Sequence, residues 1–467
     1  MPLVEPVPLL PIDQLGPVHF IAIGGAGMSG IALMYAESGV KVSGSDQSDG
    51  PLLPQLREAG IEVYVGHDPA NLGDAQTVVV SSAIKADNVE LVEAKRRGLR
   101  IWHRSAALAA LMLGKDAVSV SGTHGKTTTS AMIAYLLDSV DAKPSYVLGA
   151  RIAGGASAKL GEGKAFVIEA DESDGSFLQY PTKYAVITNI DQDHLDNWGT
   201  VENYREGYHR FASADGVEAV IISADDPGAR AEAERLKTEG KKVITFGESA
   251  QADYRLSEIT LDASGSSALI SHGEFSARFG LRQPGRHNVL DFAAAFAAAD
   301  LLGCDPVSLA AAAPGFTAAE RRFQVLGKAA GVTVVDDYAH HPDEVRATLL
   351  AAREYAGKGR VIACFQPHLF SRTQRYAAEF AQALALADII VLTDIYPARE
   401  APIPGVTGKL IADEADKLGR PVEYVAKESD LPKALAEIAA SGDLVLTIGA
   451  GSITRVGPEL LALLRGR

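Results

Sequence analysis

Short apolar runs alternate with stretches of helix length along most of this chain. The runs are rich in valine, isoleucine and alanine, and the stretches between them carry apolar residues at helical spacing. Strands buried on both faces of a parallel sheet have this near-continuous apolar pattern, and the connections between such strands are usually helices. The pattern therefore predicts an α/β protein built on parallel sheets.

The apolar runs fall into three series of strands. The first is predicted at residues 19–23, 40–42, 62–65 and 77–80, with helices at 31–38 and 88–97. The second is predicted at residues 118–121, 165–168, 185–188, 219–222 and 242–246. The third is predicted at residues 332–335, 360–365, 388–392 and 443–448. A chain of 467 residues is long enough for three domains, which we expect at 1–110, 111–321 and 322–467.

Three segments depart from the alternation. Residues 1–17 contain five prolines and are expected to stay irregular. Between about residues 251 and 283, short polar and apolar alternation predicts antiparallel strands. The alanine-rich stretch 292–302 predicts a buried helix that closes the second domain.

Composition narrows the class of protein. Cys304 and Cys364 are the only cysteines, which excludes a disulfide framework and a four-cysteine zinc site and favours a reducing compartment. The first forty residues contain no lysine or arginine, and no apolar run approaches the ~18 residues of a membrane span, so we expect a cytoplasmic protein without a membrane partner. With 59 acidic and 44 basic residues the formal charge is -15, which repels nucleic acid. Anionic ligands must then be held by local loops.

A glycine loop with the sequence Gly-Thr-His-Gly-Lys-Thr-Thr-Thr follows the first strand of the second series, at residues 122–129. Gly122 and Gly125 free backbone N–H groups to face phosphate oxygens at a helix N-terminus, where Lys126 adds positive charge and the Thr127 hydroxyl can reach Mg²⁺. The loop is a shortened P-loop, because Val120 stands where the first glycine of the full motif belongs. It predicts ATP or GTP binding, and the absence of an Asn-Lys-x-Asp guanine-reading motif disfavours a GTPase switch.

A second glycine loop, Gly-Gly-Ala-Gly-Met-Ser-Gly at residues 24–30, follows the first strand of the chain. Asp46 lies 21 residues after Gly25, so the loop taken alone predicts dinucleotide binding and an NAD-dependent oxidoreductase. An NAD enzyme would leave Lys126 and Thr127 without a role. Two separate diphosphate-type loops fit better an enzyme that couples ATP to a second nucleotide-bearing ligand, such as a UDP-sugar.

Acidic residues follow two strands of the second series. Glu169 opens an acidic segment that runs to Asp174, and His194 lies among the carboxylates of the segment 191–196. In α/β sheets, ligands bind at the carboxyl ends of the strands, and Mg²⁺ prefers oxygen ligands that it shares with phosphate. The pattern predicts a metal site near Thr127.

Taken together with five later segments, these motifs resemble those of the Mur ligase family. The later segments are Gly-Arg-His-Asn at 285–288, Arg-Arg-Phe at 321–323, Asp-Asp-Tyr-Ala-His-His-Pro at 336–342, Phe-Gln-Pro-His at 365–368 and Gly-Ala-Gly-Ser at 449–452. The resemblance covers residues 18 to about 455 in the family's order of motifs. It implies an N-terminal Rossmann-like domain for a UDP-sugar, a central P-loop ATPase domain and a C-terminal Rossmann-like domain for an amino acid.

The resemblance also implies roles for individual residues. The implied ATP-binding residues are Gly122, Thr123, His124, Gly125, Lys126, Thr127, Thr128, His287, Asn288, Arg321 and Asp337. The implied UDP-sugar residues are Gly24, Gly25, Ala26, Gly27, Met28, Ser29, Gly30, Asp46, His67, Ser81 and Ser82. The implied amino-acid residues are Tyr338, His368, Arg372 and Ala450, and the implied metal ligands are Thr127, Glu169 and His194. Lys126, His194, Arg372 and His340 are the residues expected to take part in catalysis, although the base for the amine is open among His340, His341 and His368.

The activity implied by the nearest branch of the family is the ATP-dependent joining of L-alanine to the lactyl carboxylate of UDP-N-acetylmuramate, through an acyl phosphate. Two Mg²⁺ ions are expected, with Mn²⁺ able to replace them, and the chain is expected to be a monomer or a homodimer. A recycling ligase that attaches a murein tripeptide to the same sugar nucleotide is the alternative, because it shares most of these motifs. Residues 201–214 contain no lysine, so no carbamate ligand to the metal is expected. Leu369 stands where some relatives have a basic residue, which leaves the amino-acid carboxylate to Arg372.

Overall fold

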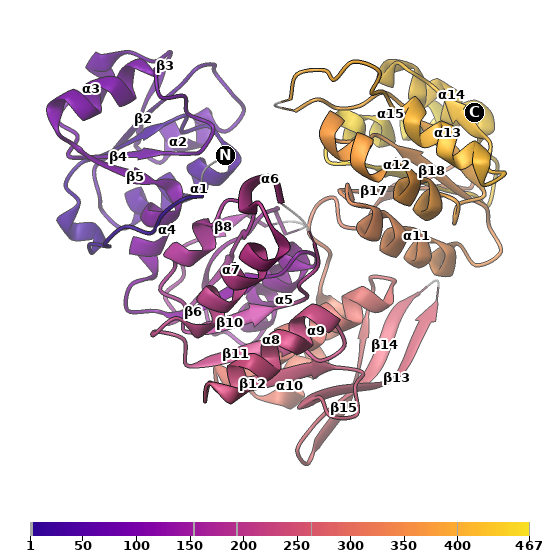
Figure 1. Ribbon diagram of the computed structural model, residues 1–467, viewed down its shortest axis with the longest axis horizontal. Helices are drawn as coiled ribbons and strands as arrows, with labels where there is room; N and C mark the ends of the chain where they lie inside the picture. The colour runs from indigo at the N-terminus through magenta and orange to yellow at the C-terminus, as the bar shows by residue number, and fades with distance from the viewer. Residues whose placement is uncertain (1–2, 153–154, 193–194, 263, 399, 467) are drawn as a thin grey trace. The chain divides into compact units, whose positions relative to one another are not determined.

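The computed structural model describes residues 3–152, 155–192, 195–262, 264–398 and 400–466 (Figure 1). The chain divides into two compact units. The first unit comprises Met1–Leu256, Ile270–Ala277 and Asp291–Ala312, and the second comprises Ser257–Leu269, Arg278–Leu290 and Ala313–Arg467. Among the described residues, no helix is both long enough and apolar enough to cross a membrane.

The first unit begins with a five-stranded parallel sheet in the order β3-β2-β1-β4-β5. Its strands are β1 (Val18–Ile21), β2 (Val42–Asp46), β3 (Glu62–Val65), β4 (Thr77–Val80) and β5 (Arg100–His103). Its helices are α1 (Ala26–Glu37), α2 (Leu53–Glu58), α3 (Val89–Arg97) and α4 (Arg104–Met112). The strands predicted at 62–65 and 77–80 are confirmed, whereas the strand predicted at 40–42 begins only at Val42. Strand β5 was not predicted, because Arg100 and His103 interrupt its apolar pattern.

The second sheet carries the P-loop and has the order β13-β12-β11-β10-β6-β9-β7-β8. Its parallel strands are β6 (Asp116–Ser121), β7 (Ser145–Val147), β9 (Ala165–Glu169), β10 (Tyr184–Ile187), β11 (Ala219–Ser223), β12 (Val243–Gly247) and β13 (Tyr254–Asp262), while β8 (Ala158–Lys159) runs antiparallel to β7. Its helices are α5 (Lys126–Ser139), α6 (Leu195–Trp198), α7 (Val201–Ser213), α8 (Pro227–Thr238), α9 (Arg286–Leu301) and α10 (Pro306–Ala312). The five strands predicted for this series are found within a residue or two of their expected bounds.

Strands β13, β14 (Gly265–His272) and β15 (Phe275–Leu281) are consecutive neighbours in this sheet, and the boundary between the two units passes through them. The connections between them are too short for a parallel crossover, which confirms the antiparallel excursion predicted at 251–283. The buried helix predicted at 292–302 is also confirmed: it lies within α9, in which residues 292–299 are buried.

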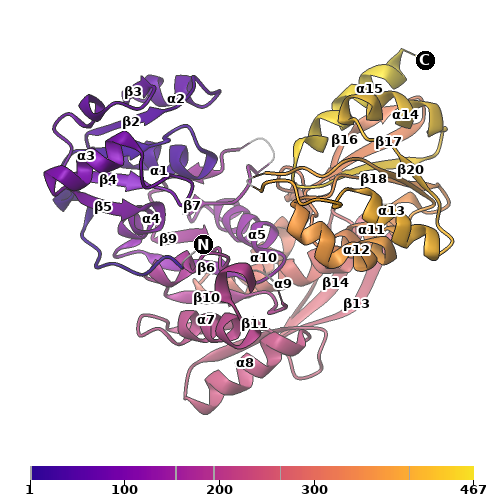
Figure 2. The same ribbon diagram turned by 45° about the horizontal axis from the view of Figure 1, so that its top comes forward.

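The second unit contains a six-stranded sheet in the order β16-β17-β21-β18-β19-β20. Its strands are β16 (Gln324–Ala329), β17 (Val332–Asp337), β18 (Val361–Phe365), β19 (Ile389–Leu392), β20 (Val422–Tyr424) and β21 (Leu444–Ile448), and only β16 is antiparallel to its neighbour. Helices α11 (Pro342–Ala356), α12 (Phe370–Leu384) and α13 (Lys409–Lys417) cover one face, and α14 (Leu431–Ile438) and α15 (Val456–Arg465) cover the other (Figure 2). The four predicted strands are confirmed, and the edge strands β16 and β20 were missed.

The proline-rich start of the chain is irregular apart from one short 3-10 turn (Ile12–Gln14), and it is attached to the second sheet's loops. The Val4 N–H donates to the Asp174 carbonyl at 2.8 Å. The backbone of Val7 and the amide group of Gln179 exchange two hydrogen bonds, of 2.6 and 3.0 Å. Because this segment leads directly into β1, it connects the first sheet of the unit with the acidic loop that follows β9.

A buried carboxylate organises the polar interior of the first sheet. The Glu90 side chain is fully buried and accepts hydrogen bonds from Ser45 (2.5 Å) and Asn71 (2.7 Å), with His19 at 3.5 Å and His67 at 3.4 Å. Burial raises the pKa of Glu90, but the nearby His19 ring and the hydrogen bonds from Ser45 and Asn71 outweigh this effect and lower the pKa to about 2. The carboxylate is therefore ionised, and it fixes His67 beside the carboxyl end of β2.

We expect Glu90→Ala to lower the free energy of unfolding by about 3 kcal/mol, because the change leaves buried polar groups without their shared partner. Glu93→Ala, on the same helix, is the matched control and should have a much smaller effect, because Glu93 pairs with the more exposed Arg96 and Arg97. Since the folded-state pKa of Glu90 lies below its ordinary value of 4.5, its contribution is complete above pH 4.5 and is lost as the pH falls toward 2. Urea unfolding of the wild type and both variants between pH 7 and pH 3 measures this. An equal effect of the two substitutions would contradict the central role of Glu90.

Candidate active site

The P-loop turns sharply at the carboxyl end of β6, where it lies against the end of β10. Gly122 has a φ of +137°, and a Cβ atom there would collide with the Thr188 hydroxyl. The His124 N–H donates to Asn189 Oδ1 at 2.9 Å, and the Asp191 N–H donates to Thr123 Oγ1 at 2.9 Å. The loop is thus held by the segment that follows β10, and glycine is required where the two backbones approach.

The loop leads into the N-terminus of α5, which packs against α9. Gly125 precedes α5 with a φ of +84°, and a Cβ atom there would lie 2.6 Å from Asp291 Oδ1. The same carboxylate oxygen accepts a hydrogen bond from the Thr129 hydroxyl at 3.1 Å. Thr127 and Thr128 are buried in the first turn of α5, so this end of the helix is held in place. The backbone N–H groups predicted to bind phosphate therefore lie at the carboxyl end of the sheet.

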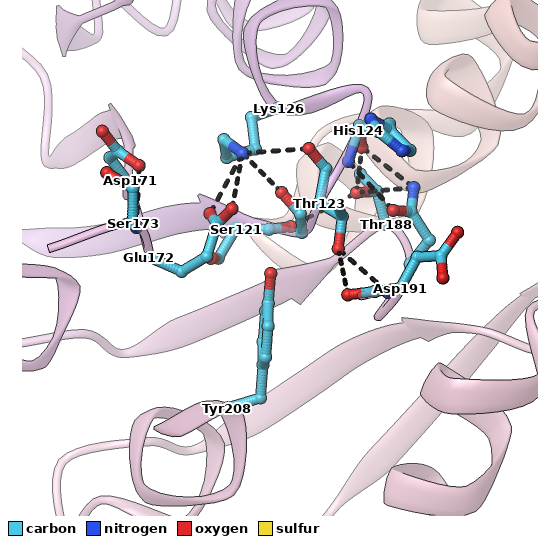
Figure 3. A network of polar contacts seen from close by, with 12 residues as sticks. Ser121, Thr123, His124, Lys126, Asp171, Glu172, Ser173, Thr188, Asp191 and Tyr208 are labelled. Carbon is cyan, nitrogen blue, oxygen red and sulfur yellow. Dashed lines mark hydrogen bonds and ion pairs between the residues drawn. The ribbon is translucent and has the colours of Figure 1, made fainter. Parts of the chain in front are cut away.

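Lys126 folds back onto its own loop (Figure 3). Its Nζ donates to the Gly122 carbonyl at 2.6 Å and to the Thr123 carbonyl at 3.2 Å. On the other side it lies 3.0 Å from each carboxylate oxygen of Glu172. The Lys126 side chain is 13% exposed and that of Glu172 is fully buried, so the pair is largely shielded from water.

Burial and charge act in opposite directions on this pair. Burial raises the pKa of Glu172 above its ordinary value, and the Lys126 charge opposes this shift. Burial also lowers the pKa of Lys126, but the negative charges of Glu172, Asp171 and Glu169 outweigh that effect and raise it above its ordinary value. Lys126 therefore remains cationic in a site where three carboxylates surround it.

Glu169 lies at the end of β9, next to the P-loop strand. In the register of the sheet it is opposite Val120, two residues before Gly122, and its Oε2 accepts a hydrogen bond from the Gly149 N–H at 2.9 Å. A carboxylate and a threonine hydroxyl near phosphate oxygens are the donor set that Mg²⁺ prefers, so these residues fit the ion. The third predicted ligand, His194, lies outside the described residues.

The first glycine loop lies at the end of β1 and begins α1. The Gly24 N–H donates to Asp46 Oδ2 at 2.9 Å, so Asp46 fixes the loop from the end of β2. Gly25 is the residue before α1, and Gly27, Met28, Ser29 and Gly30 form its first turns together with Ala26. The loop thus presents a helix N-terminus at the carboxyl edge of the first sheet, as the sequence predicts.

The other predicted UDP-sugar residues surround the same edge. The His67 ring lies 2.9 Å from the Ser45 hydroxyl through Nδ1. Ser82 follows β4, and its hydroxyl lies 3.1 Å from His103 Nε2 and 3.3 Å from Asp174 Oδ2. The neighbouring Ser81 is half-buried. Ser82 therefore connects the first sheet with the acidic loop after β9.

Sequence reasoning missed a cation at the first glycine loop. A Cβ atom on Gly27 would lie 3.0 Å from Arg104 Nη1, which places the guanidinium directly over the loop. Arg104 is half-buried at the start of α4, and within the described part of the chain it forms no hydrogen bond or ion pair. The residue stands in no recognisable motif, and its proximity to Gly27, 77 positions earlier, is visible only in the fold.

In the second unit, the predicted amino-acid residues gather at the carboxyl edge of the sheet. The His340 ring centroid lies 5.3 Å from that of Tyr338 and 5.8 Å from that of His368, and His368 stacks on Tyr396 at 5.9 Å. Burial lowers the pKa of His340 to about 3; Glu344 opposes the shift, and the charges of Arg372 and His368 add to it. His340 is therefore a neutral imidazole whose Nδ1 lies 3.2 Å from the Tyr338 carbonyl.

Arg321 and Asp337 both have partners within the second unit. The Arg321 guanidinium pairs with Asp336 at 3.1 Å, donates to the Gly449 carbonyl beside Ala450, and lies 4.8 Å from the Tyr338 ring centroid.

The buried Asp337 carboxylate accepts hydrogen bonds from the Phe323 N–H (2.7 Å), the Ala339 N–H (2.9 Å) and the Thr348 hydroxyl (3.1 Å). Arg321 and Asp337 thus organise the carboxyl end of β17. Their contacts with ATP stay a prediction.

His287 and Asn288 lie in the first turn of α9, in the part that belongs to the second unit. Burial and, to a smaller extent, the nearby Arg322 charge lower the pKa of His287 to about 4. Asn288 Nδ2 donates to the Pro284 carbonyl at 2.7 Å and lies 3.2 Å from His287 Nε2. A neutral imidazole and an amide are suitable neighbours for a purine ring, although their predicted contact with adenine stays a prediction.

A P-loop with a buried lysine, acidic strand ends and a second glycine loop define an α/β enzyme that uses nucleoside triphosphate. Models of the Mur ligase family catalytic domain, the Mur ligase middle domain and the Mur ligase glutamate ligase domain match residues 17–116, 120–299 and 321–451. The chain belongs to the Mur ligase family. This confirms the resemblance, the three-domain α/β class and the use of ATP.

Several relatives match over the whole length of the chain. A UDP-N-acetylmuramate--L-alanine ligase of Cutibacterium acnes is 55% identical over 470 residues, which cover 100% of both chains. One of Kineococcus radiotolerans is 49% identical over 462 residues, 98% of each chain. The crystal structure of a UDP-N-acetylmuramate-alanine ligase of Thermotoga maritima has 30% identity and a TM-score of 0.80, and covers 96% of this chain and 99% of that one.

We expect Gly122→Ala to destabilise the protein by about 3 kcal/mol, because it combines a disfavoured φ with a collision against β10. Gly199→Ala is the matched control, since Gly199 also has a positive φ, +78°, but has nothing within 4 Å of a Cβ position. That substitution should cost only about 1 kcal/mol of backbone strain. Urea unfolding of both variants measures the difference, and equal losses would show that the contact with Thr188 does not constrain the loop.

Proposed function

We propose that the chain joins L-alanine to the lactyl carboxylate of UDP-N-acetylmuramate and converts ATP to ADP and phosphate. The observation that carries the proposal is the P-loop with Lys126, in a chain that matches relatives with this name from end to end. The first glycine loop then holds the UDP-sugar, and the edge with Tyr338, His340 and His368 holds the amino acid. The product is a precursor of peptidoglycan.

The chemistry requires activation, because oxide cannot leave a carboxylate. The lactyl carboxylate attacks the γ-phosphorus of ATP, and the bond to the bridging oxygen of ADP breaks to give an acyl phosphate. The amine of alanine then attacks the carbonyl carbon, and the tetrahedral intermediate releases phosphate and forms the amide. Lys126 stabilises the charge on the transferring group, which is the main catalytic task in phosphoryl transfer.

The amine must be neutral to attack, so a group must accept its proton. Because its pKa is about 3, His340 is a weak base at neutral pH and better suited to orient the amine by a hydrogen bond. His368 and His341 remain candidates for the proton acceptor. Arg372, which acts electrostatically on His340 and is half-buried, supplies positive charge for the amino-acid carboxylate.

Two Mg²⁺ ions, with Mn²⁺ able to replace them, are part of the proposal. Thr127 would hold one ion, and Glu169 and His194 would hold the other. When bound, the ions neutralise charge on the phosphate oxygens. We further propose that the protein works in the cytoplasm as a monomer or a homodimer, with small-molecule substrates and without nucleic acid.

The first test is ATP-dependent phosphate release with UDP-N-acetylmuramate and one acceptor at a time: none, L-alanine, glycine, serine or murein tripeptide. We expect release with L-alanine only and a product heavier by one alanyl residue. Lys126→Met should lower kcat by about a hundredfold or more. Lys115→Met is the matched control. Lys115 precedes β6, at the end of the strand opposite the P-loop, and its Nζ donates to the Gly163 carbonyl at 3.0 Å.

Preference for the tripeptide would assign the chain to the recycling reaction. Reduction of NAD, without any use of ATP, would support the hypothesis that the first glycine loop belongs to an oxidoreductase. No sugar-dependent phosphate release with any acceptor would contradict the ligase proposal.

We also assign Arg104 to the UDP-sugar site. The first glycine loop contains no lysine or arginine of its own, and Arg104 supplies the positive charge beside it. Arg104→Gln should raise KM for UDP-N-acetylmuramate about tenfold or more, while KM for ATP stays the same. Arg100→Gln is the matched control, since Arg100 lies on β5 and bonds Thr77 at 2.9 Å.

Competition by UDP identifies the group that Arg104 binds. An equal loss of UDP affinity in Arg104→Gln places the guanidinium on the diphosphate, and unchanged UDP affinity places it on the lactyl carboxylate. An unchanged KM for the sugar nucleotide would contradict the assignment.

A further inference from the structure

Glu172 is a buried carboxylate at the P-loop for which the proposed reaction gives no role. It is neither one of the expected metal ligands nor one of the expected nucleotide contacts, yet both its oxygens lie 3.0 Å from Lys126 Nζ (Figure 3). We propose that Glu172 is a positioning residue that withdraws Lys126 from the nucleotide, and so sets how tightly ATP and ADP are held. The inference rests on the proposed function, in that it concerns the same lysine and the same nucleotide.

The ammonium group of Lys126 has all its hydrogen-bond donors occupied within the protein. An ammonium group has three N–H donors, and the partners present are the Gly122 carbonyl, the Thr123 carbonyl and the Glu172 carboxylate. All three donors are therefore engaged within the protein. A phosphate oxygen can bond Lys126 only if at least one of these partners is released.

Of the two side chains in the pair, Lys126 is the one that is free to move. The loop that carries Glu172 is fixed by the Trp198 indole N–H, which donates to the Glu172 carbonyl at 2.9 Å, and by the Asn197 amide, which donates to the Ser173 carbonyl at 2.8 Å. The Val4 N–H holds the same loop at Asp174. Lys126 instead has a flexible four-carbon stem, so the lysine moves and the carboxylate stays.

Aromatic side chains surround the Glu172 carboxylate. Glu172 Oε1 lies 3.5 Å from the Tyr204 hydroxyl, which lies 3.3 Å from the Tyr208 hydroxyl and 3.2 Å from Thr123 Oγ1. Trp198 and Phe177 pack edge-on against this pair of tyrosines, at 6.1 and 5.7 Å between ring centroids. In such an apolar setting the attraction between Glu172 and Lys126 is only weakly screened, so it competes effectively with phosphate.

The consequence is a cycle in the position of Lys126. A bound nucleotide draws the ammonium group away from Glu172, and the fixed carboxylate attracts it back as ADP leaves. Removing the charge of Glu172 therefore strengthens nucleotide binding and slows the release of ADP. Loss of a merely structural contact would instead weaken binding, or lower stability alone.

The test is ADP binding, measured by calorimetry, together with steady-state kinetics on the full-length chain. Glu172→Gln should bind ADP about tenfold more tightly than the wild type, because an amide oxygen competes weakly for the lysine. In turnover, KM for ATP and kcat should fall together. Glu172→Asp keeps the charge at a greater distance, so its ADP affinity should lie between those of the wild type and Glu172→Gln.

Asp171→Asn is the matched control. It removes the same charge from the neighbouring position, where the carboxylate accepts a hydrogen bond from the Ser173 N–H at 3.0 Å. The Asp171 charge also acts on Lys126, but no direct ion pair between them is found among the described contacts, so the change in ADP affinity should stay below twofold. Thermal unfolding with and without ADP identifies the variants that fold.

A folded Glu172→Gln or Glu172→Asp that binds ADP no more tightly than the wild type would overturn the inference. An equal gain in Asp171→Asn would also overturn it, because the effect would then be one of general charge. ADP binding needs neither the sugar nucleotide nor an amino acid, so this result is independent of the acceptor assay. Normal alanine-dependent turnover with unchanged ADP affinity in the variants would remove this inference and leave the proposed function standing.

Discussion

The close approach of the P-loop to the end of β10 is the constraint on which the nucleotide site depends. Gly122 passes so near Thr188 that no side chain fits, and the loop then bonds Asn189 and Asp191. This contact sets the direction of α5 and places Lys126 over the acidic segment after β9. The neighbouring strands β6, β9 and β10 thereby bring together loops that are separated by tens of residues in the chain.

Each of the two glycine loops lies beside a single cation, Lys126 or Arg104, although the formal charge of the chain is -15. Lys126 is compensated by a buried carboxylate, whereas Arg104 forms no hydrogen bond or ion pair within the described residues. A compensated lysine can exchange one anionic partner for another without a large change in local charge. An uncompensated arginine over a helix N-terminus instead adds to the attraction that the backbone N–H groups already exert on an anion.

Much of the fold could be predicted because its signals are local. The strands at 62–65, 77–80 and 332–335, the helix over 292–302 and both glycine loops depend on apolar runs and on backbone freedom. The predictions failed where a strand is short, at an edge or interrupted by charge, as in β5, β16 and β20. Such strands gain their stability from a neighbour in the sheet, and that neighbour is not visible in a local pattern.

The sequence by itself determined the α/β class, the two glycine loops, the acidic strand ends and the family, because each depends on residue types at fixed spacing. Only the tertiary structure decided which charges meet. It placed Arg104 over Gly27, paired Lys126 with Glu172 and buried His340 so that its imidazole stays neutral. The physical reason is that electrostatic energy depends on distance and burial in space, and folding brings together charges that sequence spacing does not relate.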